Sequence, residues 1–419
     1  MDFQDRLLFN EQTLGNGICV RTQPRENSFT SLELSVPLGS AHTGVSGIPD
    51  GGPHLLEHLL INRSKRAPGY AEYSLVAGLE GGTVNAHTNL FQTTYELSAP
   101  NESLRTLLPL LFSAVFEPVF READIVNQSG IIINERQREY WWPEDSEVSH
   151  YLSTKWQGDD RVSIDRVFGK PELLAATTTD QLTAIHAQYF TPGISVTGVG
   201  SGDLTPLTRL LEGLVLPASS LQPRIVSRQW VNREYHSHPF AGQSTYDLIV
   251  GGFSNRNSTP QEAQALSFLL RMLTNEFHGP LWKWLRHDLG KTYGIEWDSS
   301  LDSDIHDWAL NFSMSRIQDV EMVRRHLFGK IEMALRDTEL LEKEVRRRTL
   351  YSAAYLYETS QEILEDASNN LYQYGRIITE TEWQEYLKLC AKPGYLAKTL
   401  EPFLNPSAVG WFCATPEEV

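Results

Sequence analysis

Residues 49–61 constrain the fold more than any other stretch, because they specify a helix with one polar and one apolar side. A helix turns by about 100° per residue, so His54 and His58 project from one face and Glu57 lies on nearly the same face. Pro53 suits the first helical turn, where its missing N–H is not needed. The intervening leucines predict that the other face is buried. Two imidazoles beside a carboxylate suggest a zinc site with a general base.

The spacing of His54, Glu57 and His58 also fits a helix at a subunit surface, where the two histidines and the glutamate hydrogen-bond one another. A pattern fixed at so few positions also occurs by chance, so the choice between these two interpretations depends on other segments.

Length and composition indicate a soluble globular protein with two domains. The chain has 419 residues, of which 41% are hydrophobic and 21% charged, and such a length suits two domains of about 200 residues each. The formal net charge of −17 disfavours nucleic acid as a partner and would attract basic peptides.

Targeting signals are not evident in the sequence. Residues 1–6 have neither a basic start nor an apolar run, so no signal peptide is predicted, and no stretch approaches the length of a membrane span. The three cysteines, Cys19, Cys390 and Cys413, are scattered and odd in number, which argues against a disulfide framework. We therefore expect a cytoplasmic protein.

The first half of the chain alternates strands and helices. Asn16-Gly17 is a tight-turn signal between two strands, and alternating apolar residues mark the strands themselves. We expect strands within residues 13–36, 83–88, 93–97 and 194–200, and helices over 69–79, 103–116, 121–140, 180–189 and 206–214.

The long helix over 121–140 carries a carboxylate on an otherwise apolar stripe. Glu135 follows Ile132 at helical spacing, so it points in the same direction. A buried carboxylate requires a partner, and a metal ion is one of few adequate ones. Glu122 and Glu139 on the same helix are rivals for this role, and each of the three glutamates could also be a solvated helix charge.

Residues 217–223 form a proline- and serine-containing linker. We therefore expect one domain over 1–216, a linker over 217–226 and a second domain over 227–419. The order of elements repeats beyond the linker, with a helix over 260–273 in the place of the His54 helix but without histidine. This pattern predicts a duplicated domain that kept its fold and lost its metal site. Its other expected elements are strands over 247–252, 293–297, 308–313 and 408–412, and one or two helices within 339–371.

The pentapeptide His54-Leu-Leu-Glu57-His58, followed by Glu135, resembles the inverted zinc signature of the pitrilysin/insulinase metallopeptidase family. Further stretches resemble other motifs of that family: its opening hairpin, its substrate-side strand, and a motif near the start of its later domain. These stretches are 13–17, 82–95 and 289–294. The size resembles the short two-domain bacterial branch related to mitochondrial processing peptidase.

The resemblance implies that His54, His58 and Glu135 are the zinc ligands and that Glu57 activates a water molecule. One position departs from the family pattern, which usually has a second glutamate seven residues before the ligand. This chain has Gln128 there. A neutral amide can still hydrogen-bond a ligand, but it adds no negative charge around the metal.

Two further functions follow from the resemblance. Arg286 and Tyr293 match residues that hold the peptide and stabilise the oxyanion, although either could be an ordinary surface or strand residue. Asn85 and Ala86 match a strand that binds the substrate backbone by extending the sheet. His87, in the same strand, is interpreted as a surface residue, because a fourth protein ligand would close the position that catalysis needs.

The family arrangement predicts an α+β fold with two similar domains, each a mostly antiparallel sheet covered by helices. Together they would form half of a clamshell chamber. Since the zinc and the arginine–tyrosine pair lie in the first and last of four domains, a two-domain chain would need a homodimer or a heterodimer with a related subunit.

The expected activity is zinc-dependent endopeptidase cleavage of peptides or unfolded segments, including leader or bioactive peptides. The alternatives are a non-catalytic peptide-binding or scaffold subunit and a zinc hydrolase acting on small molecules.

Overall fold

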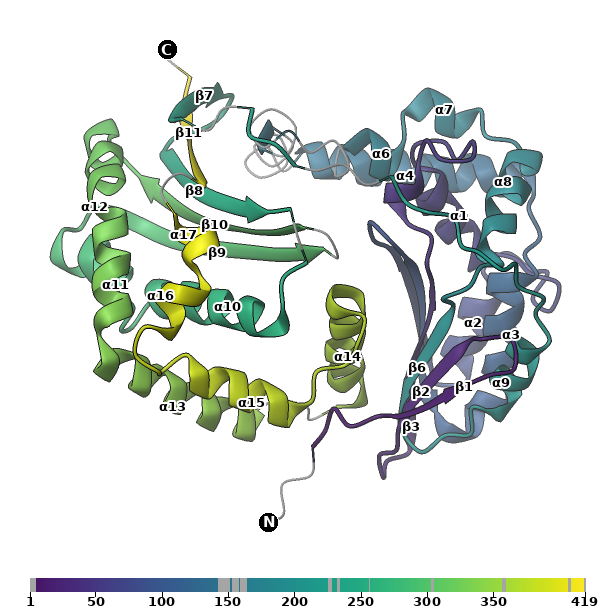
Figure 1. Cartoon of the computed structure of the whole chain (residues 1–419). Coiled ribbons are helices and arrows are strands. Elements are labelled where there is room, and N and C mark those ends of the chain that lie inside the picture. The colour runs from purple at the N-terminus through teal and green to yellow at the C-terminus, as the bar shows by residue number, and fades with distance from the viewer. Residues whose placement is uncertain are drawn as a thin grey trace.

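The structure is a computed structural model that describes residues 5–141, 151–152, 158, 164–224, 228–231, 234–255, 257–302, 305–355, 359–405 and 408–417. Two β-sheets, each covered by helices on its outer face, make up the two halves of the molecule (Figure 1). The predicted α+β class is therefore confirmed.

The first sheet has the strand order β1-β2-β6-β3-β5-β4. Strands β2 and β6 are parallel, and the other neighbours are antiparallel. The edge strand β4 is paired only with β5 among the described strands. The strand bounds are β1 (Asn10–Thr13), β2 (Cys19–Gln23), β3 (Phe29–Val36), β4 (Thr83–Thr88), β5 (Thr93–Pro100) and β6 (Ser195–Val199).

The second sheet repeats this arrangement without the first strand. Its order is β7-β11-β8-β10-β9, with β7 and β11 parallel and the remaining neighbours antiparallel. The predicted duplication of the fold is thus present in both the order and the direction of the strands. The bounds are β7 (His236–Phe240), β8 (Tyr246–Ser254), β9 (Thr292–Asp302), β10 (Ile305–Met314) and β11 (Val409–Pro416).

Strand β3 shows why each sheet has one apolar and one polar face. Leu32, Leu34 and Val36 are fully buried in the core between the sheet and its helices. Ser31 and Glu33 alternate with them and therefore project from the opposite face. The helices of this half are α1 (Gly52–Leu60), α2 (Glu72–Leu79), α3 (Leu104–Phe116), α4 (Glu122–Trp141), α6 (Ile164–Phe168), α7 (Pro171–Ala175), α8 (Thr179–His186) and α9 (Thr205–Glu212), with 3-10 turns η1 (Ser40–His42), η2 (Asn101–Ser103) and η4 (Ala187–Tyr189).

The helices of the second half pack around its own core, in which Phe268, Trp308 and Phe312 are buried. The segment predicted as one or two helices contains two, and Thr359 caps the second of them. The bounds are α10 (Pro260–Thr274), α11 (Pro280–Trp282), the π-helical turn η5 (Lys283–Asp288), α12 (Ile317–Arg336), α13 (Thr338–Tyr355), α14 (Ser360–Tyr374), α15 (Glu380–Leu389), α16 (Tyr395–Thr399) and α17 (Glu401–Leu404).

Helix α14 belongs to the second half by sequence but packs on the first sheet (Figure 1). Its residues Ile363, Leu364 and Ala367 are buried against Leu7 and Val199. The polar face of the first sheet is therefore partly covered by the other half of the chain.

Tyr151 makes the reciprocal contact from the first half to the second sheet. Its ring lies 4.5 Å from the His238 ring and packs with Phe240 and Phe412. Its hydroxyl lies 2.6 Å from Nε2 of His236. Each half thus supplies side chains that pack on the sheet of the other.

The segment predicted as a linker is partly docked on the first half. Leu221 packs against the first core, and the Arg224 backbone N–H donates to the carbonyl of Ala41 at 2.9 Å. Residues 225–226, at the end of the predicted linker, lie outside the described residues. The domain bounds themselves stay a prediction.

None of the described helices is both long enough and apolar enough to cross a bilayer.

A buried ion cluster holds α13 against α10. The Glu344 side chain is 1% exposed and accepts hydrogen bonds from Arg347 and Arg348 at 2.7 and 2.8 Å. Burial opposes ionisation of Glu344, but these arginines outweigh it and lower its pKa to about 2. Arg348 also donates to the carbonyl of Phe268 on α10 at 3.1 Å.

Replacing Glu344 by Gln is expected to lower the free energy of unfolding by about 3 kcal/mol at pH 7, because two arginines lose their counter-charge. The folded-state pKa lies below the unfolded one, so this stabilisation is complete above the unfolded value of about 4.5 and is lost as the pH falls towards 2. Urea unfolding of both proteins between pH 7 and pH 3.5 measures the difference.

The exposed neighbour Glu342 provides the control on the same helix, and Glu342→Gln should change the stability by less than about 0.5 kcal/mol. A Glu344→Gln difference that stayed constant down to pH 3.5 would contradict the assignment.

Candidate metal centre

Helix α1 begins at a backbone position that only glycine suits. Gly51 has φ +73°, and a Cβ there would lie 2.6 Å from the backbone nitrogen of Gly169. Pro53 follows in the first turn. The start of the helix is therefore fixed against the segment after α6, and His54 lies one residue beyond Pro53.

The apolar side of α1 anchors the two histidines. Leu55, Leu56 and Leu60 have no exposed surface in the first core. His54 and His58 lie on the opposite side, where each side chain keeps about one-seventh of its surface exposed, 14% and 15%. The predicted orientation of this helix is thus what the structure shows.

Helix α4 brings a carboxylate to the same place from far along the chain. Ile125, Gln128 and Ile132 are buried along one stripe, and Glu135 continues it with its side chain 31% exposed. The rival Glu122 is exposed in the first turn of the helix. The side chain of Glu139 lies outside the described part.

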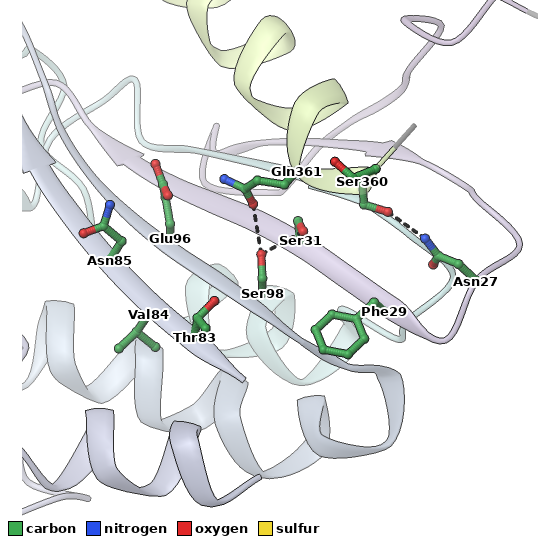
Figure 2. Close-up of a pocket in the computed structure, with 11 residues that line it drawn as sticks. Asn27, Phe29, Ser31, Thr83, Val84, Asn85, Glu96, Ser98, Ser360 and Gln361 are labelled. Carbon is green, nitrogen blue, oxygen red and sulfur yellow. Dashed lines mark hydrogen bonds between the residues drawn. The ribbon is translucent and has the colours of Figure 1, made fainter. Parts of the chain in front are cut away.

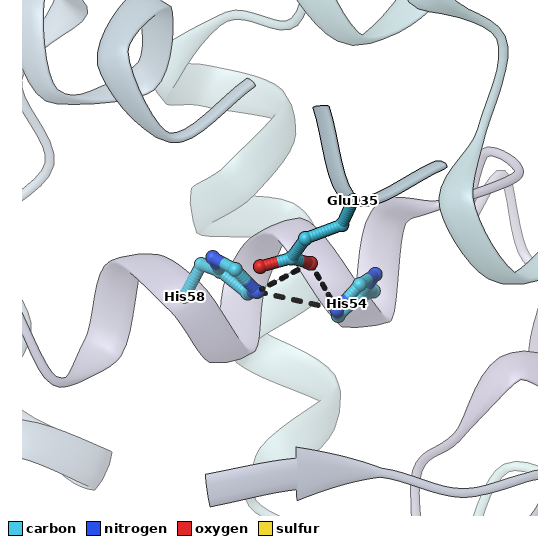
Figure 3. Close-up of side chains that lie close together, drawn as sticks. All are labelled: His54, His58 and Glu135. Carbon is cyan, nitrogen blue, oxygen red and sulfur yellow. Dashed lines mark hydrogen bonds and ion pairs between the residues drawn. The ribbon is translucent and has the colours of Figure 1, made fainter. Parts of the chain in front are cut away.

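The three predicted ligands converge at one point (Figure 3). The Nε2 atoms of His54 and His58 are 3.2 Å apart, and Oε2 of Glu135 lies 3.7 and 3.6 Å from them. Donor atoms bound at 2.0–2.1 Å around a tetrahedral zinc ion are separated by about 3.3 Å. These side chains fit a four-coordinate divalent ion with little movement and leave one position open.

The electrostatics of His54, His58 and Glu135, together called the α1–α4 trio, suit a cation. Burial and the neighbouring His58 ring lower the pKa of His54 to about 3. This imidazole is therefore neutral at physiological pH and offers the lone pair that a metal ligand requires.

Gln128 fixes the orientation of the His58 ring. Nδ1 of His58 lies 3.1 Å from Oε1 of Gln128, and the Gln128 amide donates to the hydroxyl of Tyr70 at 2.8 Å. With its amide nitrogen directed at Tyr70, Gln128 presents its oxygen as an acceptor for Nδ1–H. The Nε2 lone pair of His58 then points towards His54 and Glu135. The neutral amide thus orients the ligand, as a carboxylate in that position would.

Glu57 lies on α1 between the two histidines, and its side chain points to β4. It is 5% exposed and accepts a hydrogen bond from the Thr88 hydroxyl at 2.9 Å. Burial raises its pKa, while the nearby His58 ring and the Thr88 hydroxyl partly oppose that rise. A carboxylate with a raised pKa beside a metal position has the properties of a general base. The sequence placed Thr88 in the substrate-side strand motif but did not predict its contact with Glu57, because that contact depends on how β4 meets α1.

The predicted substrate-binding residues lie on the edge strand β4. Asn85 is exposed, and Ala86 points to the other face and packs against the first core. His87 is on the same face as Asn85, with its side chain 42% exposed.

Arg286 and Tyr293 lie in the second half, on η5 and β9, whereas the trio lies on α1 and α4 of the first half (Figure 1). Arg286 is exposed and donates to the carbonyl of Thr292 at 3.2 Å. Of the Tyr293 side chain nothing is described.

Comparison with known proteins finds a family match. Residues 20–162, which contain α1 and α4, match the model of the insulinase family, peptidase family M16. Over these residues the chain is similar to the insulinase (M16) peptidases. Its sequence is 25% identical over 214 residues to PqqL of Escherichia coli, described as a probable zinc protease; the match covers 48% of this chain and 22% of PqqL.

Solved structures share the fold of this chain over nearly its whole length. A putative M16-like peptidase from Alicyclobacillus acidocaldarius aligns with a TM-score of 0.79 at 16% identity, covering 100% of both chains. A peptidase M16 inactive domain from Pseudomonas fluorescens aligns with a TM-score of 0.80 at 15% identity, covering 98% of both. The periplasmic protease PqqL aligns with a TM-score of 0.78 at 14% identity, where 97% of this chain covers 47% of PqqL.

Replacing Gln128 by Leu is expected to lower the affinity of the trio for Zn2+ by about 10- to 100-fold, because the His58 ring loses the acceptor that orients it. Competition with a chromogenic chelator measures the affinity. Asn127 also contacts the Tyr70 hydroxyl, at 2.7 Å, but is exposed and not bonded to His58. Asn127→Leu should therefore bind Zn2+ as the wild type does, and equal losses in both variants would refute the role of Gln128.

Proposed function

We propose that the protein is a zinc-dependent endopeptidase that cleaves peptides or unfolded polypeptide segments. The observation that carries the proposal is the convergence of His54, His58 and Glu135 within 3.7 Å, with Glu57 held beside them. Two imidazoles and one carboxylate with an open fourth position are the ligand set of catalytic zinc sites. The sequence similarity to a probable zinc protease supports zinc as the metal.

When bound, the zinc ion polarises the scissile carbonyl and lowers the pKa of water. Glu57 accepts a proton from the attacking water and later gives it to the leaving amine. Its hydrogen bond from Thr88 holds the carboxylate in one orientation, and its burial strengthens it as a base.

The edge strand β4 is the proposed substrate-binding element. Its outer side has no strand partner in the described part of the chain, so a peptide can add to the sheet through main-chain hydrogen bonds. Asn85 and Ala86 would pair with the substrate backbone. Recognition through the backbone accounts for a preference for extended, unfolded segments.

We further propose that the working assembly contains two such chains or one such chain with a related subunit. This chain aligns with about half of PqqL, 47% of that chain, and in the proposed assembly a partner supplies the matching second half. Arg286 and Tyr293 of the partner would then reach the zinc site of this chain, where the arginine and the phenol stabilise negative charge on the substrate carbonyl.

The second candidate is a non-catalytic subunit of such a peptidase. It is favoured by the Pseudomonas fluorescens structure, which shares this fold and is described as an inactive domain. The fold alone therefore does not decide between the two, whereas the intact set of His54, Glu57, His58 and Glu135 favours catalysis.

Replacing Glu57 by Gln is expected to leave zinc binding intact and lower peptide hydrolysis by at least about a hundredfold, because the amide cannot accept the proton. Zinc content by atomic emission and cleavage of an unfolded fluorogenic peptide test both parts. The exposed Glu80 is the control, and Glu80→Gln should retain full activity. Wild-type protein that holds zinc but cleaves no unfolded peptide, alone or with a related subunit, would support the non-catalytic candidate.

Mixing two inactive variants tests the sharing of sites across a homodimer. Arg286→Ala supplies an intact Glu57, and Glu57→Gln supplies an intact Arg286. After subunit exchange about a quarter of wild-type activity is expected, since half of the dimers carry one complete site out of two. Each variant exchanged with itself is the control. Absence of rescue, with exchange shown by mass spectrometry, would refute sharing between identical chains.

A further inference from the structure

The polar face of the first sheet carries a second group of metal-binding side chains, separate from the α1–α4 trio. Glu33 on β3 and Glu96 on β5 are directly opposite each other in the sheet register. His87 on the edge strand β4 is opposite Thr94, two residues before Glu96. The three side chains therefore come from three adjacent strands and project from one face.

Their ligand atoms are close enough that a modest movement of the side chains would let them share one ion. One carboxylate oxygen of Glu33, one of Glu96 and one ring nitrogen of His87 all lie within 4.8 Å of one another. Nδ1 of His87 is 3.5 Å from Oε1 of Glu96. The Thr94 hydroxyl lies within 3.0 Å of the His87 ring nitrogens and holds the ring in the cluster.

The two carboxylates of the cluster have no lysine or arginine partner in the described part of the chain. Glu33 is 6% exposed. Glu33 and Glu96 lie directly opposite each other on adjacent strands, so two carboxylates of like charge face one another. A buried carboxylate that has no basic side chain beside it is stabilised by a bound cation.

A cavity adjoins the cluster at Glu96. It has a volume of about 540 Å3 and lies between β4, β5 and the start of α14. Figure 2 shows Glu96 and Asn85 on its wall, with Gln361 of α14 opposite. The Glu96 carboxylate is therefore open to small ions that enter this cavity.

We propose that Glu33, His87 and Glu96 form a second metal site, which takes a divalent transition-metal cation such as Zn2+. The imidazole favours a transition metal over Mg2+ or Ca2+, and the two carboxylates balance the charge of the ion. Three protein ligands leave the remaining positions to water.

The second site lies next to the first along β4. His87 is followed by Thr88, and these residues point to opposite faces of the sheet, Thr88 to Glu57 and His87 to the cluster. A cation bound by β3, β4 and β5 crosslinks the edge strand to the interior of the sheet. It also places positive charge beside the outer side of β4.

Metal stoichiometry tests the proposal without relying on activity. Metal-free protein is dialysed against Zn2+ and the bound metal is measured by atomic emission. Wild type should hold two ions per chain, and Glu96→Gln and His87→Ala should each hold one. The double variant His54→Ala/His58→Ala should also hold one ion. Adding Glu96→Gln to this double variant should remove the remaining ion. Circular dichroism shows whether each variant is folded.

Matched controls exclude adventitious binding by surface groups. Glu365 on α14 and His326 on α12 are exposed and lie outside both clusters, so Glu365→Gln and His326→Ala should keep two ions. A single ion in wild type that is lost in His54→Ala/His58→Ala would overturn the second site. A single ion that persists in that variant and is lost in Glu96→Gln would support the second site and refute the α1–α4 trio.

Discussion

The packing of α1 against α4 brings together the ligand set on which the proposed chemistry depends. Buried leucines hold α1 to the first core, and the buried Ile125 and Ile132 hold α4 to the same core. This apolar contact brings two imidazoles and a distant carboxylate to within 3.7 Å. The convergence of polar groups costs electrostatic free energy in the absence of a cation, and the hydrophobic contacts of both helices offset that cost.

Local periodicity was sufficient to predict the elements that carry the trio. The four-residue spacing of His54 and His58 fixes their common face, and the stripe of α4 fixes the direction of Glu135. The choice of Glu135 over Glu122 and Glu139 needed the family resemblance, because helical spacing alone left three candidates. The hydrogen bonds of Gln128 could not be predicted, since they depend on Tyr70 in another segment.

The features that the sequence did not reveal all depend on long-range register. His87 was predicted to be a surface residue of β4, which agrees with its exposure, but its neighbours Glu33 and Glu96 come from strands whose pairing no local pattern specifies. The packing of α14 on the first sheet could not be predicted either. The amphipathic pattern of α14 shows that it has a buried face but not which sheet covers that face.

The exchange of packing between the two halves limits how this molecule can move. Helix α14 covers part of the first sheet, and Tyr151 packs on the second. Spreading the halves apart would expose apolar surface on both sheets at once, so we expect the two halves to move as one rigid unit. In the proposed two-subunit assembly, a large substrate would therefore enter by separation of the two subunits, with each subunit moving as a rigid body.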